Sequence, residues 1–180
     1  ALFVSTASAY DGTYGAQIDL DGTAWIMMKD DTPADEPRYR ARFYMDPNSI
    51  SMIDNEMMEV MYGTSSLGRV FGIYLGIDGG EYFIRTYLEN DAGAQSWSGV
   101  YTITDDWHVI EIDWKAATGD GANDGYITLW IDEVLQGTFN GMDNDSYLIS
   151  GVRLGATNSV DTNTVGTLYF DAFESRRETY

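Results

Sequence analysis

The chain has 180 residues, of which 29 are acidic and 10 are basic, so its formal net charge is −19. This charge argues against nucleic acid and an anionic membrane surface as partners, because both require patches of Lys and Arg. The absence of cysteine excludes disulfides, Cys-ligated zinc and a thiol nucleophile, and no apolar run reaches the roughly 18 residues of a membrane span.

Short strands separated by turns are the only regular elements that the sequence predicts. Turn dipeptides such as Asp11-Gly12 and Asp124-Gly125 tolerate positive φ angles and divide the chain at short intervals. In chain order, the predicted strands lie near residues 16–20, 24–29, 38–45, 56–61, 69–75, 81–88, 97–103, 107–114, 126–132, 152–155 and 167–173. The segment 56–61 also fits a helix, but we interpret it as a strand because nothing else in the chain has helical periodicity.

Alternation of apolar and polar residues indicates which side of each strand faces the core. In the segment 38–45, Tyr39, Ala41, Phe43 and Met45 point to one side and Arg38, Arg40, Arg42 and Tyr44 to the other. By the same pattern, the side chains predicted to face the core are those of Ile110, Ile112, Ile127, Leu129 and Ile131. The single histidine, His108, lies on the apolar side of its strand, which favours a buried core histidine over a catalytic base.

These patterns predict an all-β fold in one domain spanning residues 1–180. Ten or more short antiparallel strands without helices must pack as two sheets or close into a barrel. A propeller requires an internal repeat, and none is present. We therefore expect a two-sheet antiparallel β-sandwich of the jelly-roll type.

Two segments carry a resemblance to a known superfamily. Trp107-His108 with Glu111 on one strand, followed by Asp124-Gly125 with Leu129 and Asp132 on the next, resembles the laminin-G and concanavalin A-like lectin and glucanase superfamily. The ending from Gly166 to Arg176 is similar to the closing strand of many secreted bacterial members. The resemblance implies a jelly roll of two curved sheets, with ligands on the concave face or at a loop rim, and a secreted or cell-surface location.

The same resemblance bears on catalysis. Retaining glucanases of this superfamily carry three acids on alternate positions of one strand, so that two of them flank the glycosidic bond. This chain supplies Glu111 and Asp113, but the next positions are Lys115 and Ala116. Without the last carboxyl, the mechanism lacks its general acid, and we expect no enzymatic activity. A glycoside hydrolase or a polysaccharide lyase stays open as an alternative; a lyase would use Arg40, Arg42, Tyr44, Arg85 and Tyr87 in one groove.

Aromatic and charged residues on the outward sides of the strands suggest a carbohydrate-binding surface. Sugars stack their C–H faces on aromatic rings, while Arg, Asp and Glu bind hydroxyls in pairs. The candidate set is Arg40, Arg42, Tyr44, Trp107, Glu111, Asp113 and Trp130. The alternative is that these residues form aromatic and ion pairs with one another across neighbouring strands.

A structural Ca²⁺ is expected from the superfamily, whose jelly rolls often hold calcium between an Asp near the C-terminus and the N-terminal strand region. Asp171 in the closing strand and Asp11 in an early turn are the candidate ligands. A hard divalent cation bound there would also relieve the repulsion of a strongly acidic chain.

The sequence therefore predicts a non-catalytic, extracellular glycan-binding or adhesion domain, stabilised by calcium. A second hypothesis is a self-assembling fibre or surface-layer subunit. It rests on residues 1–7, which are apolar, prone to form a strand, and able to pair either within the chain or with the sheet edge of a neighbouring copy.

Overall fold

The computed structural model describes residues 1–177, and these form strands and turns without a helix. The described part therefore contains no helix that could cross a membrane. The strands are β1 (Leu2–Ser5), β2 (Gly15–Asp21), β3 (Ile26–Asp30), β4 (Arg38–Asp46), β5 (Met57–Ser65), β6 (Gly68–Asp78), β7 (Glu81–Glu89), β8 (Gln95–Trp97), β9 (Tyr101–Ile103), β10 (His108–Lys115), β11 (Gly125–Ile131), β12 (Val134–Met142), β13 (Gly151–Asn158) and β14 (Val165–Arg176).

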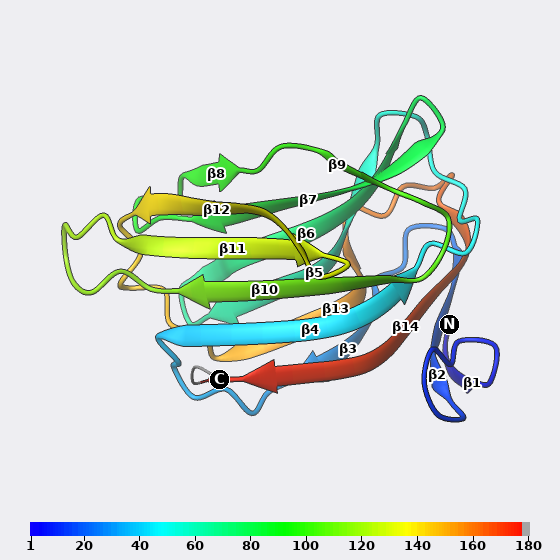
Figure 1. Ribbon diagram of the computed structural model, residues 1–180, viewed down its shortest axis with the longest axis horizontal. Helices are drawn as coiled ribbons and strands as arrows, with labels where there is room; N and C mark the ends of the chain where they lie inside the picture. Colours follow the sequence, from blue (N-terminus) through cyan, green and yellow to red (C-terminus); the bar gives the residue numbers. More distant parts are fainter. Residues whose placement is uncertain (178–180) are drawn as a thin grey trace.

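The strands form two antiparallel sheets that lie face to face (Figure 1). Sheet A has the order β1-β2-β14-β4-β10-β11-β12, and sheet B has the order β3-β13-β5-β6-β7-β8, with β9 pairing β7 beside β8. Each sheet combines strands that follow one another in the chain with strands that are distant in it, such as β4 beside β10 and β13 beside β5. This arrangement is the β-sandwich that the sequence predicted.

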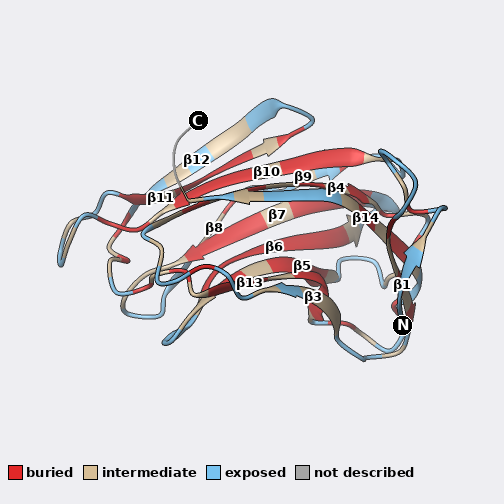
Figure 2. Ribbon diagram, turned by 90° about the horizontal axis from the view of Figure 1, so that it is seen from below, coloured by how far each residue is buried: buried red, intermediate tan, exposed pale blue. Residues whose placement is uncertain are grey.

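The core lies between the two sheets, where the apolar halves of the alternating strands meet (Figure 2). In β4 the burial pattern alternates at every residue, with Tyr39, Ala41, Phe43 and Met45 inside. The five predicted core residues Ile110, Ile112, Ile127, Leu129 and Ile131 are all buried in the same cluster. The edge strands β1 and β12 are the most exposed parts of sheet A.

The predicted strands agree with the structure, with two differences. The segment 56–61, which we interpreted as a strand, lies in β5 from Met57 onward, so that interpretation is confirmed. The predicted strand 97–103 is interrupted into β8 and β9, because Ser98 leaves the regular pattern and its hydroxyl accepts a hydrogen bond from the amide of Thr86. Strand β12 was not predicted, since an edge strand with an exposed surface lacks the apolar alternation that signals a half-buried one.

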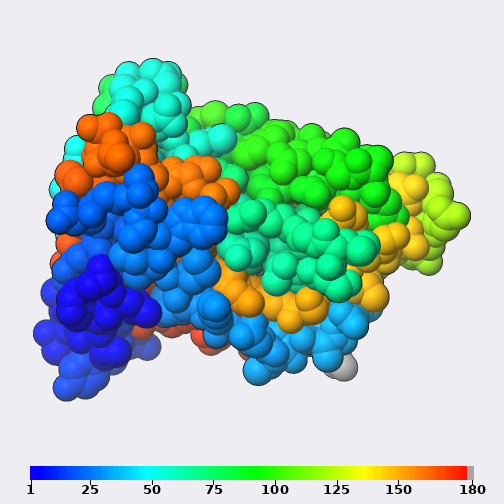
Figure 3. Space-filling model, turned by 180° about the vertical axis from the view of Figure 1, so that it is seen from behind, coloured from blue at the N-terminus to red at the C-terminus, as the bar shows by residue number. Residues whose placement is uncertain are grey.

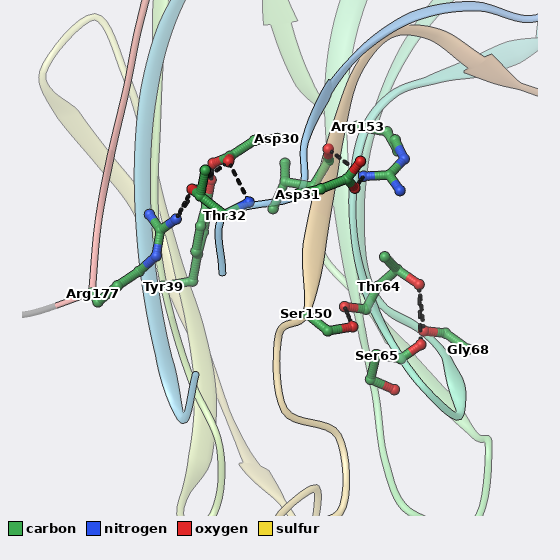
Figure 4. Close-up of polar contacts among 11 residues, drawn as sticks. Asp30, Asp31, Thr32, Tyr39, Thr64, Ser65, Gly68, Ser150, Arg153 and Arg177 are labelled. Carbon is green, nitrogen blue, oxygen red and sulfur yellow. Dashed lines mark hydrogen bonds and ion pairs between the residues drawn. The ribbon is translucent and has the colours of Figure 1, made fainter. Parts of the chain in front are cut away.

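The loop after β3 joins the two sheets along one side of the sandwich (Figure 4). The Asp30 carboxylate accepts hydrogen bonds from the hydroxyl and amide of Thr32, and from Tyr39 of β4 at 3.3 Å. Burial alone would raise the pKa of Asp30, but the Thr32 hydrogen bonds and the charge of Arg177 outweigh it and lower this pKa. The contact links an edge of sheet B to the centre of sheet A.

Candidate functional site

The structure brings most of the predicted glycan-binding residues together on the solvent side of sheet A, which we call the A face. In the register of β4, β10 and β11, Arg42 lies opposite Glu111, and Glu111 lies opposite Trp130. Arg40 lies opposite Asp113 one row away. Trp107 comes directly before β10, and its ring lies 5.6 Å from that of Tyr10.

The charged groups of the A face bind one another. Arg38 donates two hydrogen bonds to the Asp113 carboxylate, at 2.9 and 2.6 Å, and the bond to Asp113 raises the pKa of Arg38. The Nε of Arg42 lies 3.6 Å from Glu111. These are the cross-strand ion pairs that the sequence left open as the alternative, and glycan binding by this set stays a prediction.

A row of aromatic rings crosses one end of the A face. Tyr10 stacks on Tyr44 at 3.8 Å between ring centroids, and Trp107 stacks on Tyr169 at 6.2 Å. Beside them is a pocket of about 380 Å³ lined by Tyr10, Asp11, Arg42, Tyr44, Ala172 and Glu174. The pocket offers a small polar recess next to aromatic rings.

The predicted calcium ligands Asp11 and Asp171 lie close together, and a hydrogen bond from the Asp11 amide to the Asp171 carboxylate connects them. One oxygen of Asp171 accepts the amides of Tyr10 and Asp11, at 2.8 and 2.9 Å, and the other accepts the amide of Ala172 at 2.7 Å. These bonds already tie the closing strand to the N-terminal region, which is the role expected of calcium. Calcium at this pair stays a prediction.

A second group of carboxylates lies in the loops that follow β7 and β12. Oxygens of Asp91, Asp143 and Asp145 lie within 4.8 Å of one another, so this group could hold a metal ion. The pKa of Asp145 is raised by desolvation and then by its neighbour Asp91. This group was not predicted from the sequence, because its members come from two loops that only the fold brings together.

His108 is buried and fully engaged, as the sequence predicted. Its Nε2 accepts the amide hydrogen of Thr104 at 3.1 Å, which places the ring proton on Nδ1. Nδ1 lies 2.7 Å from the Asp132 carboxylate. The ring borders a pocket of about 730 Å³ at the strand ends, but both of its nitrogens already have partners in the chain.

The solvent side of sheet B, which we call the B face, carries a different arrangement that the sequence analysis did not assemble. The strand register aligns one residue from each of six strands in a row, running Lys29, Arg153, Tyr62, Gly72, Tyr87 and Trp97. A second row beside it consists of Glu59, Tyr74 and Arg85. Figure 3 views this side of the molecule, with β5 and β6 in teal at its centre.

Two glycines of β6 allow large rings to lie against the B face. A Cβ atom on Gly72 would fall 2.4 Å from the Tyr87 ring and 2.7 Å from Oε1 of Glu59. A Cβ atom on Gly76 would fall 2.2 Å from the ring of Phe83. Since no side chain fits there, glycine at both positions is what lets Tyr87 and Phe83 pack over the sheet.

The carboxylate of Glu59 lies beneath this surface, entirely shielded from solvent. Its Oε2 accepts hydrogen bonds from Arg69 and from the Thr157 hydroxyl, both at 3.1 Å, while Oε1 has no partner. Burial raises the pKa of Glu59, against the opposing charge of Arg69. Burial, followed by the charge of Glu59, also raises the pKa of Tyr74 to about 12.

Arginine side chains lie over aromatic rings at two places on the B face. The guanidinium of Arg69 is 4.4 Å from the centroid of the Tyr62 ring. That of Arg85 is 4.7 Å from the Trp97 ring, which in turn packs on Tyr87 at 4.9 Å. The B face therefore presents an alternation of arginine and aromatic groups at its surface.

The alternative lyase set drawn from the sequence does not form one groove. Arg40, Arg42 and Tyr44 lie on the A face, whereas Arg85 and Tyr87 lie on the B face, on the opposite side of the molecule. The sequence did contain a pattern that points to the B face. Gly72, Tyr74 and Gly76 occupy alternate positions of β6, and Arg85 and Tyr87 occupy alternate positions of β7. Only the pairing of β6 with β5 and β7 shows that these residues share a surface.

Comparison with known proteins supports the fold. No family model and no curated protein matches the chain. Among solved structures, the cellulose-induced protein Cip1 superposes with a TM-score of 0.68 at 16% identity, covering 99% of this chain and 86% of that one. The globular domain of T. cruzi calreticulin superposes with a TM-score of 0.65 at 10% identity, covering 99% of this chain and 80% of that one. The alginate lyase Aly36B superposes with a TM-score of 0.54 at 13% identity, covering 94% of this chain and 83% of that one. The chain has the concanavalin A-like jelly-roll fold that its sequence resembles.

Proposed function

We propose that this chain is an extracellular, non-catalytic carbohydrate-binding domain and that the B face is its binding surface. The observation that carries the proposal is the row of residues across six strands of sheet B from Lys29 to Trp97. Its middle members Gly72 and Tyr87 are buried, and the residues toward its two ends supply the surface that a ligand can contact. At about 4.8 Å between strands, the row is about 24 Å long, which suits a polysaccharide of several units. Its aromatic and cationic groups are those that bind sugar rings and their substituents.

Names of the structural neighbours are consistent with this proposal. Cip1 is described as induced by cellulose, and Aly36B is an alginate lyase whose structure has also been determined with an alginate tetrasaccharide. Their identities to this chain are 16% and 13–14%, so they support the fold and leave the ligand to be tested.

The burial of the acidic groups supports a non-catalytic role. Glu59, the carboxyl with a raised pKa on the B face, has no exposed surface through which it could contact a substrate. On the A face, Asp113 is held by Arg38, and Lys115 stands where the third acid of the glucanase pattern would lie. A proton donor in contact with substrate is needed for glycoside cleavage.

The test is affinity electrophoresis in gels containing single polysaccharides. Trp97→Ala and Tyr62→Ala should weaken binding at least about tenfold, because each removes a ring of the row together with the surface on which Arg85 or Arg69 is held. Trp130→Ala on the A face is the matched control and should leave binding unchanged. If Trp130→Ala weakens binding and the B face variants do not, the A face set predicted from sequence is the site. The chain length of the bound polysaccharide should stay constant on prolonged incubation.

Self-assembly is a second candidate function, supported by the two edges of sheet A. Neither β1 nor β12 contains a charged side chain, although the formal net charge of the chain is −19. Leu2, Phe3 and Val4 are exposed on β1, as are Val134 and Leu135 on β12. Edge strands that lack charges are sites of pairing between chains. Light scattering at rising protein concentration should then show assemblies that Leu135→Lys abolishes, whereas a monomer at all concentrations would reject this candidate.

A further inference from the structure

The charge on the B face contrasts with the acidity of the chain. Lys29, Arg69, Arg85 and Arg153 lie on this face, and they are four of the ten basic residues in the sequence. Two of the four are neutralised within the chain: Arg69 lies 3.0 Å from Glu59, and Arg153 lies 2.7 Å from Asp31 (Figure 4). The other two carry the inference.

Arg85 lacks the kind of partner that most other arginines have. A carboxylate lies within 4.0 Å of Arg38, Arg40, Arg42, Arg69, Arg153 and Arg177. Among residues 1–177, none lies that close to Arg85, whose guanidinium donates one hydrogen bond, from Nε to the carbonyl oxygen of Ser98. In a chain with 29 acids, Arg85 therefore has its terminal amino groups available to an external acceptor.

The position of Arg85 prepares it for an anion. Stacking over the Trp97 ring and the bond from Nε to Ser98 hold the guanidinium in one orientation. A guanidinium held in place binds a planar carboxylate or a sulfate through two parallel hydrogen bonds, with little further loss of conformational entropy. Lys29, exposed at the other end of the row, likewise has no carboxylate within 4.0 Å in the described chain.

We propose that the B face binds an anionic glycan, and that Arg85 pairs with an oxyanion substituent of that glycan while Lys29 attracts a second one further along the row. This inference rests on the proposed function, because it names the class of glycan for the same surface. A neutral glycan would bind best to uncovered aromatic rings. On the B face, Arg69 lies over Tyr62 and Arg85 lies over Trp97, so a ligand meets guanidinium groups as well as rings.

The experiment compares one polymer with and without its charge. Isothermal titration calorimetry would measure binding of polygalacturonate, of the same polymer after reduction of its carboxyl groups, and of dextran sulfate. Polygalacturonate or dextran sulfate should bind at least about tenfold more tightly than the reduced polymer, and added NaCl should weaken that binding. Whichever charged polymer binds more tightly identifies the substituent as carboxylate or sulfate.

Variants assign the effect to the named residues. Arg85→Gln should lower affinity for the charged polymer about tenfold or more, and Lys29→Gln should lower it by a smaller factor. Lys115→Gln removes the same charge from sheet A and should leave affinity unchanged. Lys29 is exposed, so its variant tests the proposal even if Arg85→Gln perturbs folding, which thermal unfolding would detect.

Two results would overturn the inference in distinguishable ways. If the reduced polymer binds as tightly as the charged ones, and Arg85→Gln and Lys29→Gln have no effect, the anionic class is wrong while carbohydrate binding stands. If none of these polymers, nor any neutral polysaccharide, binds, the proposed function itself fails.

Discussion

The two outer faces of the sandwich use similar residues in opposite ways. On the A face, arginine and carboxylate side chains pair across neighbouring strands: Arg42 with Glu111 at partly exposed positions, and Arg38 with the buried Asp113. On the B face, the carboxylate of Glu59 is buried under Arg69, and Arg85 is left without an acidic partner in the described chain. Ion pairs that satisfy each other suit a surface with a structural role, whereas an unpaired, oriented arginine suits a surface that binds a ligand.

The largest difference between the faces should appear in stability. Arg69→Met leaves the buried Glu59 carboxylate without its counter-charge, which typically costs about 3–5 kcal/mol. Arg42→Met on the A face breaks a pair whose side chains are 33% and 28% exposed, and such pairs are worth about 1 kcal/mol or less. Urea unfolding followed by tryptophan fluorescence measures both.

Equal losses of stability in the two variants would mean that Glu59 is better solvated than its burial indicates. Glu59→Gln is the companion variant, because it removes the buried charge while keeping a similar shape. Combined with Arg69→Met, it should recover part of the stability that Arg69→Met alone loses.

A smaller effect is expected from calcium, which tests the A face alone. A ligand that binds only the native state adds about 2.7 kcal/mol at a hundredfold excess over its Kd. If Asp11 and Asp171 hold calcium, millimolar Ca²⁺ should raise the melting temperature more than NaCl of equal ionic strength, and Asp171→Asn should remove the difference. The carboxylate of Asp171 already accepts three backbone amides, so Asp171→Asn in the absence of calcium is the necessary baseline.

The group formed by Asp91, Asp143 and Asp145 provides the control for that measurement. If the calcium-specific rise in melting temperature persists in Asp171→Asn but disappears in Asp143→Asn, the calcium site lies in these loops. A rise that NaCl reproduces would show that only screening of the acidic surface is involved.

Much of the fold could be predicted from local patterns. Alternation in residues 38–45 and 107–114 identified both strands and their buried sides, because burial of one side of a sheet imposes a period of two on the sequence. The same reasoning placed Glu111 and Asp113 on the outward side, where ion pairs across neighbouring strands were the alternative to glycan binding, and it identified His108 as a core residue. It failed for β12, whose exposed edge position imposes no such pattern.

The candidate site on the B face could not be predicted in this way. Tyr62 and Arg153 are 91 positions apart in the sequence, yet they are directly opposite in the register of β5 and β13. A single alternating strand states which of its residues point outward but carries no information about which strand lies next to it. The glycan-binding residues predicted from the sequence therefore came from β4, β10 and β11 and the position just before β10. Of these strands, β10 and β11 follow one another in the chain.

By itself, the amino-acid sequence determined most of the strands, the inner and outer sides of those that alternate, the class of fold and the acidity of the surface, since each of these follows from local periodicity or from composition. The tertiary structure alone decided which outward residues share a face, that Glu59 is buried beside Arg69, and that Arg85 has no acidic partner in the described chain. The physical reason is that the order and register of strands are set by hydrogen bonds and packing between segments far apart in the chain, and every cross-strand row depends on them.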